Sequence, residues 1–411
     1  MSVLVVNAGS SSLKYAVLEP SGDPAAAARR LGGGTVERIG SDGARLRHDG
    51  PGGRAVDDEA VDAPDHAAAL RAAADALAAH GPSLDDVTAV GHRVVHGGED
   101  FSGPVVVDDR VLARIAELAV LAPLHNPVNA AGIRAARERF GDVPHVAVFD
   151  TAFHADLPEV ARTYAVPREW REEHGVRRYG FHGTSHAYVS RAATAWLQRE
   201  RGTDPGAARV VVLHLGNGAS ACAVRGGRSV DTSMGLTPLA GLVMGSRSGD
   251  VDPALAGHLR RVAGLDAEAV EEALNGASGL RGLCGDGDVR DVTRRAEAGE
   301  QDAALALAVY AYRVRAYVGA YAVALEGLDA LAFTAGVGEN SARVRADVCD
   351  GLAVLGVQVD PARNADVAAG PGDVVPVHPG AAAGPAVLVV PTDEEGEIAR
   401  QAVDLLTAGG D

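Results

Sequence analysis

The chain has 411 residues, 38 basic and 55 acidic side chains, a formal net charge of −17 and 47% hydrophobic residues. This length accommodates two or three domains, which excludes a peptide hormone, a coiled coil and a disulfide miniprotein. The acidic balance argues against nucleic acid and anionic membranes as partners, so an anionic substrate would need a local basic cluster.

The sequence lacks the features of an exported or membrane-bound chain. The longest Ala-rich stretch, residues 303–325, is interrupted by Arg313 and Arg315, and the first seven residues lack the basic segment of a signal peptide. The three cysteines are odd in number, widely spaced and without a CxxC pair, which favours a reducing compartment. We therefore expect a cytoplasmic protein.

Strand-like apolar runs alternate with Ala- and Leu-rich helical patterns along the chain. The apolar runs predict strands over residues 3–6, 13–18, 87–95, 145–149, 210–215, 330–334 and 386–390. Apolar spacings of three and four, several of them preceded by Asp, Ser or Asn caps, predict helices over residues 66–79, 109–122, 126–139, 184–199, 302–325, 340–355 and 393–407. The alternation predicts the α/β class.

The two halves of the chain contain similar segments. Residues 3–17 and 210–224 each consist of an apolar strand, a Gly-bearing loop with Asn and Ser, and a second apolar strand. Such a hairpin exposes backbone N–H groups and hydroxyls, which are the donors that a phosphate needs. One such loop is more often an ordinary hairpin turn, but two in matching positions favour phosphate binding.

The duplication predicts two similar domains that close on one nucleotide. The first comprises residues 1–151 and a returning C-terminal helix in 393–411, and the second comprises residues 152–392. Because no long flexible linker separates the two, we expect short hinges near Thr151 and Thr392.

Three cations occupy positions that favour anion binding. Lys14 is the only lysine among the 38 basic residues, and an arginine-rich composition explains the others, so Lys14 is expected where a compact ammonium is needed. Arg93 lies between apolar residues at the end of a predicted strand, where a cation is costly unless an anion meets it. Arg247 lies in the Gly-rich loop 244–250.

Several histidines and one aspartate lie at the ends of predicted elements. His125 lies in a loop, Asp150 follows a strand, and His182 and His186 precede a helix at a spacing of four. That spacing permits zinc, but the Gly-Thr-Ser that follows His182 lacks the glutamate of HExxH, so zinc is disfavoured. A lone histidine is as readily a buried structural residue as a functional one.

A second Gly-rich segment, residues 334–340, joins a strand to a helix and could cradle a nucleotide at the helix N-terminus. It is not a Rossmann GxGxxG. Residues 216–218 are not a Walker loop, because no GK[ST] follows them.

These segments together resemble the acetate kinase family. The resemblance extends in family order from residue 3 to residue 395, and its motifs are NAGSSSLKYAVLE, GHRVVHGG, LAPLHNP, VFDTAFH, YGFHGTSH, HLGNGAS, DTSMGLTPLAGLVMGSRSGDVDP, FTAGVGEN and PTDEE. It implies the fold of the acetate and sugar kinase, actin and chaperone-ATPase superfamily, in which two ribonuclease H-type domains flank a nucleotide cleft. It also implies a homodimer that converts ATP and acetate reversibly into ADP and acetyl phosphate with Mg²⁺, or with Mn²⁺ in its place.

The resemblance implies a role for each matching residue. Asn7 and Glu394 would hold the metal, Arg93 would bind the substrate carboxylate, and Asp150 would be the essential acidic residue. Phosphates would face Lys14, Ser10 and Ser12, and the group in transfer would be stabilised by His182, Arg247 and His125. The nucleotide would contact His214, Leu215, Gly216, Asn217, Gly218, Asp288, Val289, Arg290, Gly336, Val337, Gly338, Glu339 and Asn340. The substrate's methyl group would contact Val95, Leu124, Phe181 and Pro238.

The chain departs from the family pattern at three places. Members usually have Glu where this chain has Ala240 and Thr where it has Ser246. Residues 284–287 replace a commoner Ser-Gly and Ser-Asn run before Asp288. All three departures concern the predicted edge of the nucleotide site.

The chemistry of phosphoryl transfer agrees with these roles. Transfer of a γ-phosphoryl group concentrates charge on three oxygens, so the site needs cations and N–H donors. A carboxylate nucleophile is already ionised, so we interpret Asp150 as an orienter of metal or water and not as a proton acceptor. The alternatives are a kinase for propionate or butyrate and, less favoured, an actin- or chaperone-type ATPase switch, which would not need Arg93 for a small anion.

Overall fold

A computed structural model describes residues 1–9, 11–23, 25–380 and 384–408 of the protein. Ser10, one of the predicted phosphate-binding residues, lies outside the described residues. None of the described helices is long and apolar enough to span a membrane.

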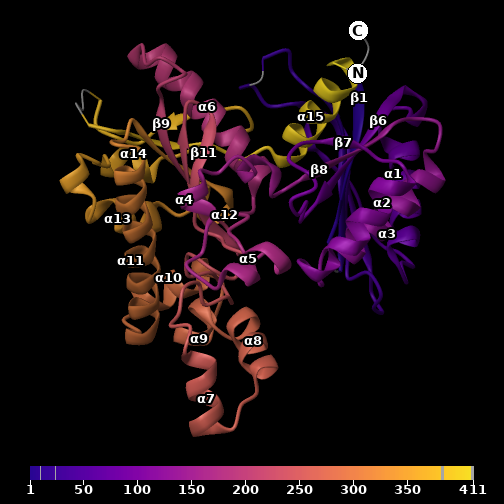
Figure 1. Ribbon diagram of the computed structural model, residues 1–411. Helices are drawn as coiled ribbons and strands as arrows, with labels where there is room; N and C mark the ends of the chain where they lie inside the picture. The colour runs from indigo at the N-terminus through magenta and orange to yellow at the C-terminus, as the bar shows by residue number, and fades with distance from the viewer. Residues whose placement is uncertain (10, 24, 381–383, 409–411) are drawn as a thin grey trace. The chain divides into compact units, whose positions relative to one another are not determined.

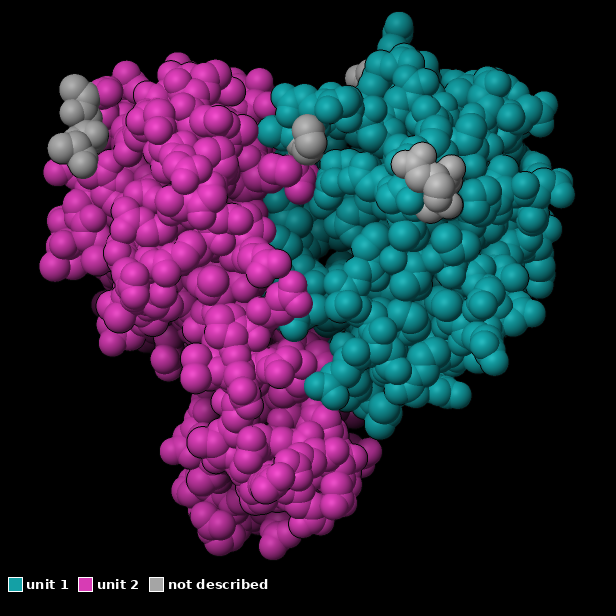
Figure 2. All heavy atoms as spheres, turned by 45° about the horizontal axis from the view of Figure 1, so that its top comes forward, with its two compact units in different colours: residues 1–155, 183–188, 393–411 teal, residues 156–182, 189–392 magenta. Residues whose placement is uncertain are grey.

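The chain divides into two compact units, which Figure 2 shows in different colours. Unit 1 contains Met1–Ala155, Gly183–Tyr188 and Asp393–Asp411, and unit 2 contains Asp156–His182 and Val189–Thr392. The domain bounds expected from the sequence, 1–151 with 393–411 and 152–392, stay predictions, and the contacts group residues 152–155 and 183–188 with unit 1. The hinges near Thr151 and Thr392 stay predictions.

Unit 1 is built on a sheet in the order β5-β4-β3-β2-β1-β6-β8-β7. Its strands are β1 (Ser2–Ala8), β2 (Ser12–Glu19), β3 (Arg29–Glu37), β4 (Arg45–Asp49), β5 (Ala55–Ala60), β6 (Val87–Val94), β7 (Val105–Val106) and β8 (His145–Phe149). Its helices are α1 (His66–His80), α2 (Asp109–Glu117), α3 (Asn126–Arg139) and α15 (Glu394–Ala408), with short 3-10 turns η1 (Pro51–Gly53), η2 (Leu84–Asp86), η3 (Leu118–Val120) and η4 (Ala152–His154).

Helices cover both faces of this sheet. Successive side chains of β1 point to opposite faces. Leu4 and Val6 pack in the core with α1, and Val3 and Val5 pack in a second core with Ile398 of α15. Figure 1 shows α1 to α3 on one side of the sheet and α15 on the other. The C-terminal helix α15 therefore covers one face of the sheet of unit 1.

Unit 2 has a sheet in the order β11-β10-β9-β12-β14-β13. Its strands are β9 (Arg209–Leu215), β10 (Ala219–Arg225), β11 (Arg228–Thr232), β12 (Ala330–Thr334), β13 (Val375–Pro376) and β14 (Ala386–Val389). Its helices are α4 (Glu159–Arg162), α5 (Arg168–His174), α7 (Leu255–Ala263), α8 (Ala267–Gly276), α9 (Gly279–Cys284), α10 (Val289–Glu297), α11 (Gln301–Ala324), α12 (Ala335–Asn340), α13 (Ala342–Asp350), α14 (Pro361–Ala365) and the 3-10 turn η5 (Ala353–Leu355). Helix α6 (Gly183–Arg201) begins in unit 1 and continues into unit 2.

The two sheets repeat one topology. In unit 1 the order β3-β2-β1-β6-β8 has antiparallel pairs up to β1 and parallel pairs from β1 to β8. In unit 2 the order β11-β10-β9-β12-β14 has the same directions. The first two strands of each sheet in chain order form an antiparallel hairpin, β1–β2 or β9–β10. The predicted α/β class and the ribonuclease H-type duplication are confirmed.

The predicted helix over residues 340–355 is present as α13, but it is shorter and spans Ala342–Asp350. Helix α12 ends at Asn340, and the Oγ of Ser341 accepts a hydrogen bond from Val344 N at 3.2 Å, which starts α13 as a separate helix. The predicted cradle 334–340 is therefore mostly helical itself. The sequence analysis also missed β3, because its three glycines disfavour a strand. A side chain at Gly34 would collide with the Arg47 carbonyl of the neighbouring strand β4.

Candidate functional site

Three parallel strands of unit 1 bring polar residues to one edge of the sheet. Asn7 lies near the end of β1, Arg93 near the end of β6, and Asp150 directly after β8. Carboxyl ends of adjacent parallel strands lie at the same edge, where α/β sheets bind ligands. The Asp150 N–H donates to the Val94 carbonyl at 2.9 Å, so the aspartate continues the register of β8.

Arg93 and Asp150 form a two-bond ion pair at this edge. Arg93 Nε donates to Asp150 Oδ1 at 3.0 Å, and Nη2 donates to Oδ2 at 2.6 Å. The Asp150 side chain is 1% exposed and the Arg93 side chain is 21% exposed. Charge-assisted bonds in this parallel geometry orient a guanidinium strongly. The ion pair occupies the edge of the Arg93 guanidinium that carries Nε and Nη2. The edge that carries Nη1 and Nη2 faces other groups.

Further oxygen donors surround Arg93. Asn7 Oδ1 lies 3.4 Å from Nη1, and Glu394 Oε2 lies 4.0 Å from Nε. Burial raises the pKa of Glu394, while Arg93 and Lys14 lower it. Amide and carboxylate oxygens are the ligands of hard divalent cations, and a partly buried carboxylate is stabilised by added positive charge. The residues present therefore fit a Mg²⁺ ion.

Two other predicted residues lie in the hairpin β1–β2. Lys14 is the direct cross-strand partner of Asn7, so both side chains lie on one face of the hairpin. Lys14 is exposed, and Ser12 at the start of β2 is half-buried. The Gly9 N–H donates to the Ser12 carbonyl at 2.8 Å and closes the loop.

A buried asparagine that the sequence analysis missed ties this hairpin to the strand of Arg93. Asn129 Oδ1 accepts from Val95 N at 3.0 Å, and its Nδ2 donates to the Ala8 carbonyl at 2.9 Å. No local pattern indicates this role, because its partners Val95 and Ala8 are distant in the sequence. His125, from the same motif, is half-buried at the N-cap of α3.

The four predicted methyl-contact residues divide between the units. Val95 is buried in unit 1, whereas Leu124 is 73% exposed because it lies in the turn before α3. Phe181 is buried and Pro238 is half-buried in unit 2. Leu124 therefore contributes no enclosed surface within unit 1.

In unit 2 two histidines stack beside the hairpin β9–β10. The rings of His182 and His214 have centroids 4.0 Å apart, and His182 Nδ1 lies 2.8 Å from Ser220 Oγ. His182 is the N-cap residue of α6 with φ 56°, a strained left-handed conformation for a residue other than glycine. His186, by contrast, lies within unit 1, where its ring contacts His154 edge-on.

Arg247 lies next to His182 in unit 2. A Cβ placed on Gly218 would lie 3.5 Å from both His182 Nε2 and Arg247 Nη1, so the bare backbone of the hairpin lies between the two side chains. Arg247 Nη1 donates to the Pro238 carbonyl at 3.0 Å. Burial lowers the pKa of Arg247, and no carboxylate of the described residues pairs with it. A half-buried cation without a counter-charge is a candidate anion site.

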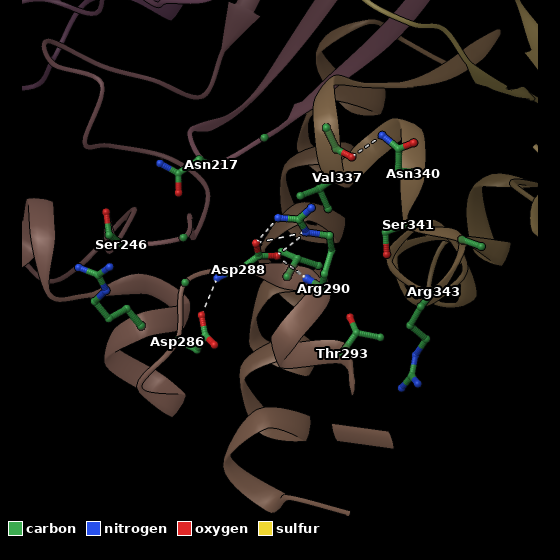
Figure 3. A pocket seen from close by; sticks show the side chains of 17 residues that line it. Asn217, Ser246, Asp286, Asp288, Arg290, Thr293, Val337, Asn340, Ser341 and Arg343 are labelled. Carbon is green, nitrogen blue, oxygen red and sulfur yellow. Dashed lines mark hydrogen bonds and ion pairs between the residues drawn. The ribbon is translucent and has the colours of Figure 1, made fainter. Parts of the chain in front are cut away.

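A cavity of about 1120 Å³ adjoins this region within unit 2 (Figure 3). Its volume suits a nucleotide. Asp288 and Arg290 lie on one wall, where Arg290 Nε donates to Asp288 Oδ1 at 3.0 Å. The Arg290 side chain and backbone N–H lower the pKa of Asp288 to about 2. The carboxylate is therefore ionised over the physiological range.

Many of the predicted nucleotide contacts line the cavity: Gly216, Asn217, Asp288, Val289, Arg290, Gly336, Val337 and Asn340. The remaining five do not line it: His214, Leu215, Gly218, Gly338 and Glu339. Further lining residues come from loops and helix starts. Ser246, Asp286 and Gly287 belong to the predicted edge of the nucleotide site, whereas Gly245, Arg281, Thr293, Ser341, Ala342 and Arg343 were not predicted. The sequence does not show that these residues lie together, because the wall of the cavity is built from four segments that are far apart along the chain.

Glu339 points away from the cavity and stabilises the start of α12. Its Oε1 accepts from Ala335 N at 2.8 Å and from Thr392 N at 3.0 Å. Ala335 has φ 63°, which is costly for a residue with a Cβ. The carboxylate therefore compensates a strained turn that leads into the cavity wall.

Arg345 stabilises the other end of α12. Its side chain is 1% exposed, and Nη1 donates to the carbonyls of Gly338 at 3.0 Å and Glu339 at 2.7 Å. Nε donates to Asn364 Oδ1 at 2.7 Å. Burial lowers the pKa of Arg345 to about 10. Arg345 thus satisfies the last carbonyls of a short helix whose residues form the cavity wall.

The repeated sheet order, the two hairpins and the cavity define a two-domain protein of the actin-like ATPase fold. The acetokinase family matches residues 2–400 of the chain. The acetate kinase of Leifsonia xyli subsp. xyli is 55% identical over 410 residues, which cover 99% of this chain and 100% of that protein. The chain belongs to the acetokinase family, and it is therefore a kinase.

Solved structures agree with this assignment. The crystal structure of Porphyromonas gingivalis acetate kinase has a TM-score of 0.88 and 41% identity, covering 98% of this chain and 99% of that chain. A propionate kinase from Francisella tularensis has a TM-score of 0.87 and 37% identity, covering 97% and 98%. Family membership favours the kinase over the ATPase switch considered as an alternative.

Proposed function

We propose that the chain transfers the γ-phosphoryl group of ATP reversibly to acetate, giving acetyl phosphate and ADP. The observation that carries the proposal is Arg247, which has no carboxylate partner among the described residues. It lies beside Gly218 and His182, in the unit that also contains the nucleotide-sized cavity. The names of the relatives supply the substrate, and the site chemistry fits it.

In unit 2 the nucleotide would occupy the cavity, with its phosphates directed to the hairpin 215–219. Backbone N–H groups there can approach phosphate oxygens closely because Gly216 and Gly218 lack side chains. Arg247 and His182 would donate to the oxygens of the group in transfer. Such preorganised donors stabilise the charge of the transition state.

In unit 1 Arg93 would bind the acetate carboxylate. Asp150 occupies one edge of its guanidinium, so the edge with Nη1 and Nη2 is the one offered to the substrate. Acetate is ionised at neutral pH and needs no general base. Asp150 would therefore orient Arg93 and nearby water, in keeping with its two hydrogen bonds to that arginine.

Asn7 and Glu394 would hold Mg²⁺, for which Mn²⁺ is a substitute, and Lys14 and Ser12 would bind phosphate oxygens nearby. The ion, when bound, would neutralise negative charge on the phosphates of the nucleotide. His125 would stabilise the group in transfer, and Val95, Phe181 and Pro238 would contact the methyl group. Val95 and Phe181 are buried apolar side chains, as that contact requires.

The proposal includes that the protein is a homodimer in the cytoplasm. Its three cysteines are buried thiols, which suits a reducing compartment. Helix α11 exposes Leu305, Tyr312 and Val323 along one face while its opposite face lies in the core. A helix with apolar residues on all sides is normally buried on all sides. A second copy of the chain would cover this face.

The decisive experiment is acyl phosphate capture. The purified protein is incubated with ATP, Mg²⁺, acetate and hydroxylamine, and acetohydroxamate is measured, with propionate and butyrate in parallel. We expect product that depends on acetate and is lost with EDTA. Phosphate release that is independent of any carboxylate would support the ATPase switch, and a preference for butyrate would support the longer-acid kinase. Size-exclusion chromatography with light scattering tests the dimer.

A further inference from the structure

Arg247 lies in a loop whose ends are joined by one aspartate. The segment from Gly241 to Asp250 contains no helix or strand. Asp250 N donates to the Gly241 carbonyl at 3.0 Å, and Gly241 N donates back to Asp250 Oδ1 at 2.8 Å. These two bonds close a ten-residue loop at its base.

The second oxygen of the same carboxylate binds a tyrosine on a long helix. The hydroxyl of Tyr317, in α11, donates to Asp250 Oδ2. Burial, followed by this hydrogen bond, raises the pKa of Tyr317, so the hydroxyl keeps its proton at neutral pH. The ring of Tyr317 also packs against Tyr321, with centroids 5.6 Å apart. The loop base is thereby fastened to a helix that spans unit 2.

The backbone at the loop base has little room to adjust. Gly249 has φ 68°, and a Cβ there would collide with the carbonyls of Gly241 and Leu242. Gly241 has φ 103°, and its Cβ would lie 2.7 Å from the Ser233 carbonyl. Positive φ and this close approach both require glycine. The backbone conformation at the base of the loop is therefore fixed.

The far side of the loop is held by α9. Leu280 N donates to the Met244 carbonyl and Arg281 N donates to the Gly245 carbonyl, both at 2.9 Å. The Arg247 side chain itself has one hydrogen bond to the protein through oxygen, to the Pro238 carbonyl. Its position therefore depends on the loop backbone more than on contacts of the guanidinium.

We infer that Asp250 and Tyr317 are positioning residues for Arg247. A donor stabilises a transition state only if it is already aimed at the developing charge, and a displacement of about 1 Å can cost about 100-fold in rate. The carboxylate joins both ends of the loop and the tyrosine prevents the carboxylate from rotating. The inference rests on the proposed role of Arg247 in phosphoryl transfer.

The first test removes one hydroxyl group. Tyr317→Phe should lower kcat roughly tenfold, while the KM values for ATP and acetate change less than about twofold. The reason is that the displaced Arg247 loses an interaction that it makes only in the transition state. Tyr310→Phe is the matched control. Tyr310 lies in the same helix, and its buried hydroxyl has no partner among the described residues, so its removal should leave kcat unchanged.

The second test separates positioning from folding. Inhibition by ADP, acetate and a planar aluminium fluoride mimic of the phosphoryl group is measured alongside the affinity for ADP alone. For Tyr317→Phe and for Asp250→Asn we expect weaker binding of the mimic by the same factor as the loss in kcat, with unchanged affinity for ADP. The double variant should be no slower than Asp250→Asn alone, because both residues act through one carboxylate.

Two results would overturn the inference. One is a Tyr317→Phe enzyme with normal kcat and normal affinity for the mimic. The other is a parallel loss of affinity for ADP and for the mimic, which indicates general damage to unit 2. Arg247→Ala distinguishes failure of the positioning inference from failure of the proposed function. If Arg247→Ala keeps its kcat, the proposed role of Arg247 in phosphoryl transfer is wrong. If Arg247→Ala loses kcat and Tyr317→Phe does not, only the positioning inference is wrong.

Discussion

The sheets of the two units share one strand order but treat their arginines in opposite ways. In unit 1 Arg93 is paired in a fork with Asp150, and Glu394 lies nearby. In unit 2 Arg247 has no carboxylate partner among the described residues. The duplicated fold therefore supplies the same edge twice, and the side chains placed there decide its electrostatic character.

This difference assigns a type of ligand to each edge. The edge of unit 1 is rich in oxygen ligands, which suit a metal ion, and its oriented arginine suits the small carboxylate that we propose as substrate. The edge of unit 2 offers N–H donors and an uncompensated cation, which suit phosphate. A kinase for a carboxylic acid needs both, because the acceptor and the donor of the phosphoryl group are both anionic.

The largest effect should come from the unpaired arginine. Arg247→Ala should lower kcat by about 100-fold to 1000-fold, the scale of losing one transition-state donor. Arg247→Lys should recover little of it, because a lysine lacks the planar fork. Steady-state kinetics measure both, with Arg225→Lys, a half-exposed arginine of unit 2, as the control. Near-normal turnover of Arg247→Lys would contradict the comparison.

The paired arginine should respond through orientation. Asp150→Asn removes the fork partner of Arg93 and leaves it with the more distant carboxylate of Glu394 at 4.0 Å, so kcat/KM for acetate should fall by about 100-fold and stability by about 3 kcal/mol. Asp329→Asn is the control, since it removes the Asp329 partner of Arg209 away from the proposed site. That variant should lose stability and keep kcat/KM. Equal losses of activity in both variants would show that Asp150 is structural only.

A third prediction concerns the wall of the cavity in unit 2. Arg345→Lys cannot reach the Gly338 and Glu339 carbonyls and Asn364 together, so α12 should loosen. We expect the KM for ATP to rise about tenfold, the value of losing one charged hydrogen bond, with the KM for acetate unchanged. Arg209→Lys serves as the control. Equal changes in the two KM values would argue against a local effect.

The histidines sharpen the comparison through pH. In unit 1 the buried pair His92 and His145 has His92 Nε2 2.9 Å from His145 Nδ1, and burial lowers the pKa of both below 6.5. In unit 2 the pair of His182 and His214 lies at the site edge. As the pH falls, these histidines take up protons in the unfolded chain before they do so in the folded protein, and this favours unfolding. The stability from the buried pair is therefore complete above about pH 6.5 and is lost as the pH falls below it.

The expected loss is up to about 1.4 kcal/mol per pH unit for each buried histidine. Urea unfolding at pH 7.5, 6.5 and 5.5 measures it. His92→Gln should flatten the dependence, whereas the exposed His258→Gln should not change it. If the pH dependence of stability is unchanged in His92→Gln, the buried histidine pair is not its cause.

The smallest effect concerns the methyl contact. Val95→Ala enlarges a buried site next to Arg93 without changing that arginine. The ratio of kcat/KM for propionate over acetate should rise, within the range of about 1–3 kcal/mol that one methylene can contribute. Butyrate should stay the poorest of the three acids in the wild type. If the ratio of kcat/KM for propionate over acetate does not change, Val95 does not contact the methyl group of the substrate.

Local sequence patterns were enough to predict many of the elements and the family. Strong local patterns correctly predicted β8, β12 and α3 to the residue, because apolar runs and caps act over a few neighbours. The two loop motifs at matching positions indicated the duplication, and strand order confirmed it. Helix α12 over Ala335–Asn340 was not predicted, because its two glycines disfavour a helix, and α13 begins two residues later than predicted.

Only the tertiary structure decided which charges have partners. Arg93 and Asp150 are 57 residues apart, and Asp250 and Tyr317 are 67 apart. Nothing in either local sequence shows that one arginine is paired and that Arg247 is not. Likewise Glu339 belongs to a predicted nucleotide motif, yet its carboxylate supports the backbone of α12 and Thr392. Local sequence sets propensity and hydrophobic pattern, whereas pairing depends on which strand ends and loops the fold brings within 3 Å, a distance set by packing over the whole unit.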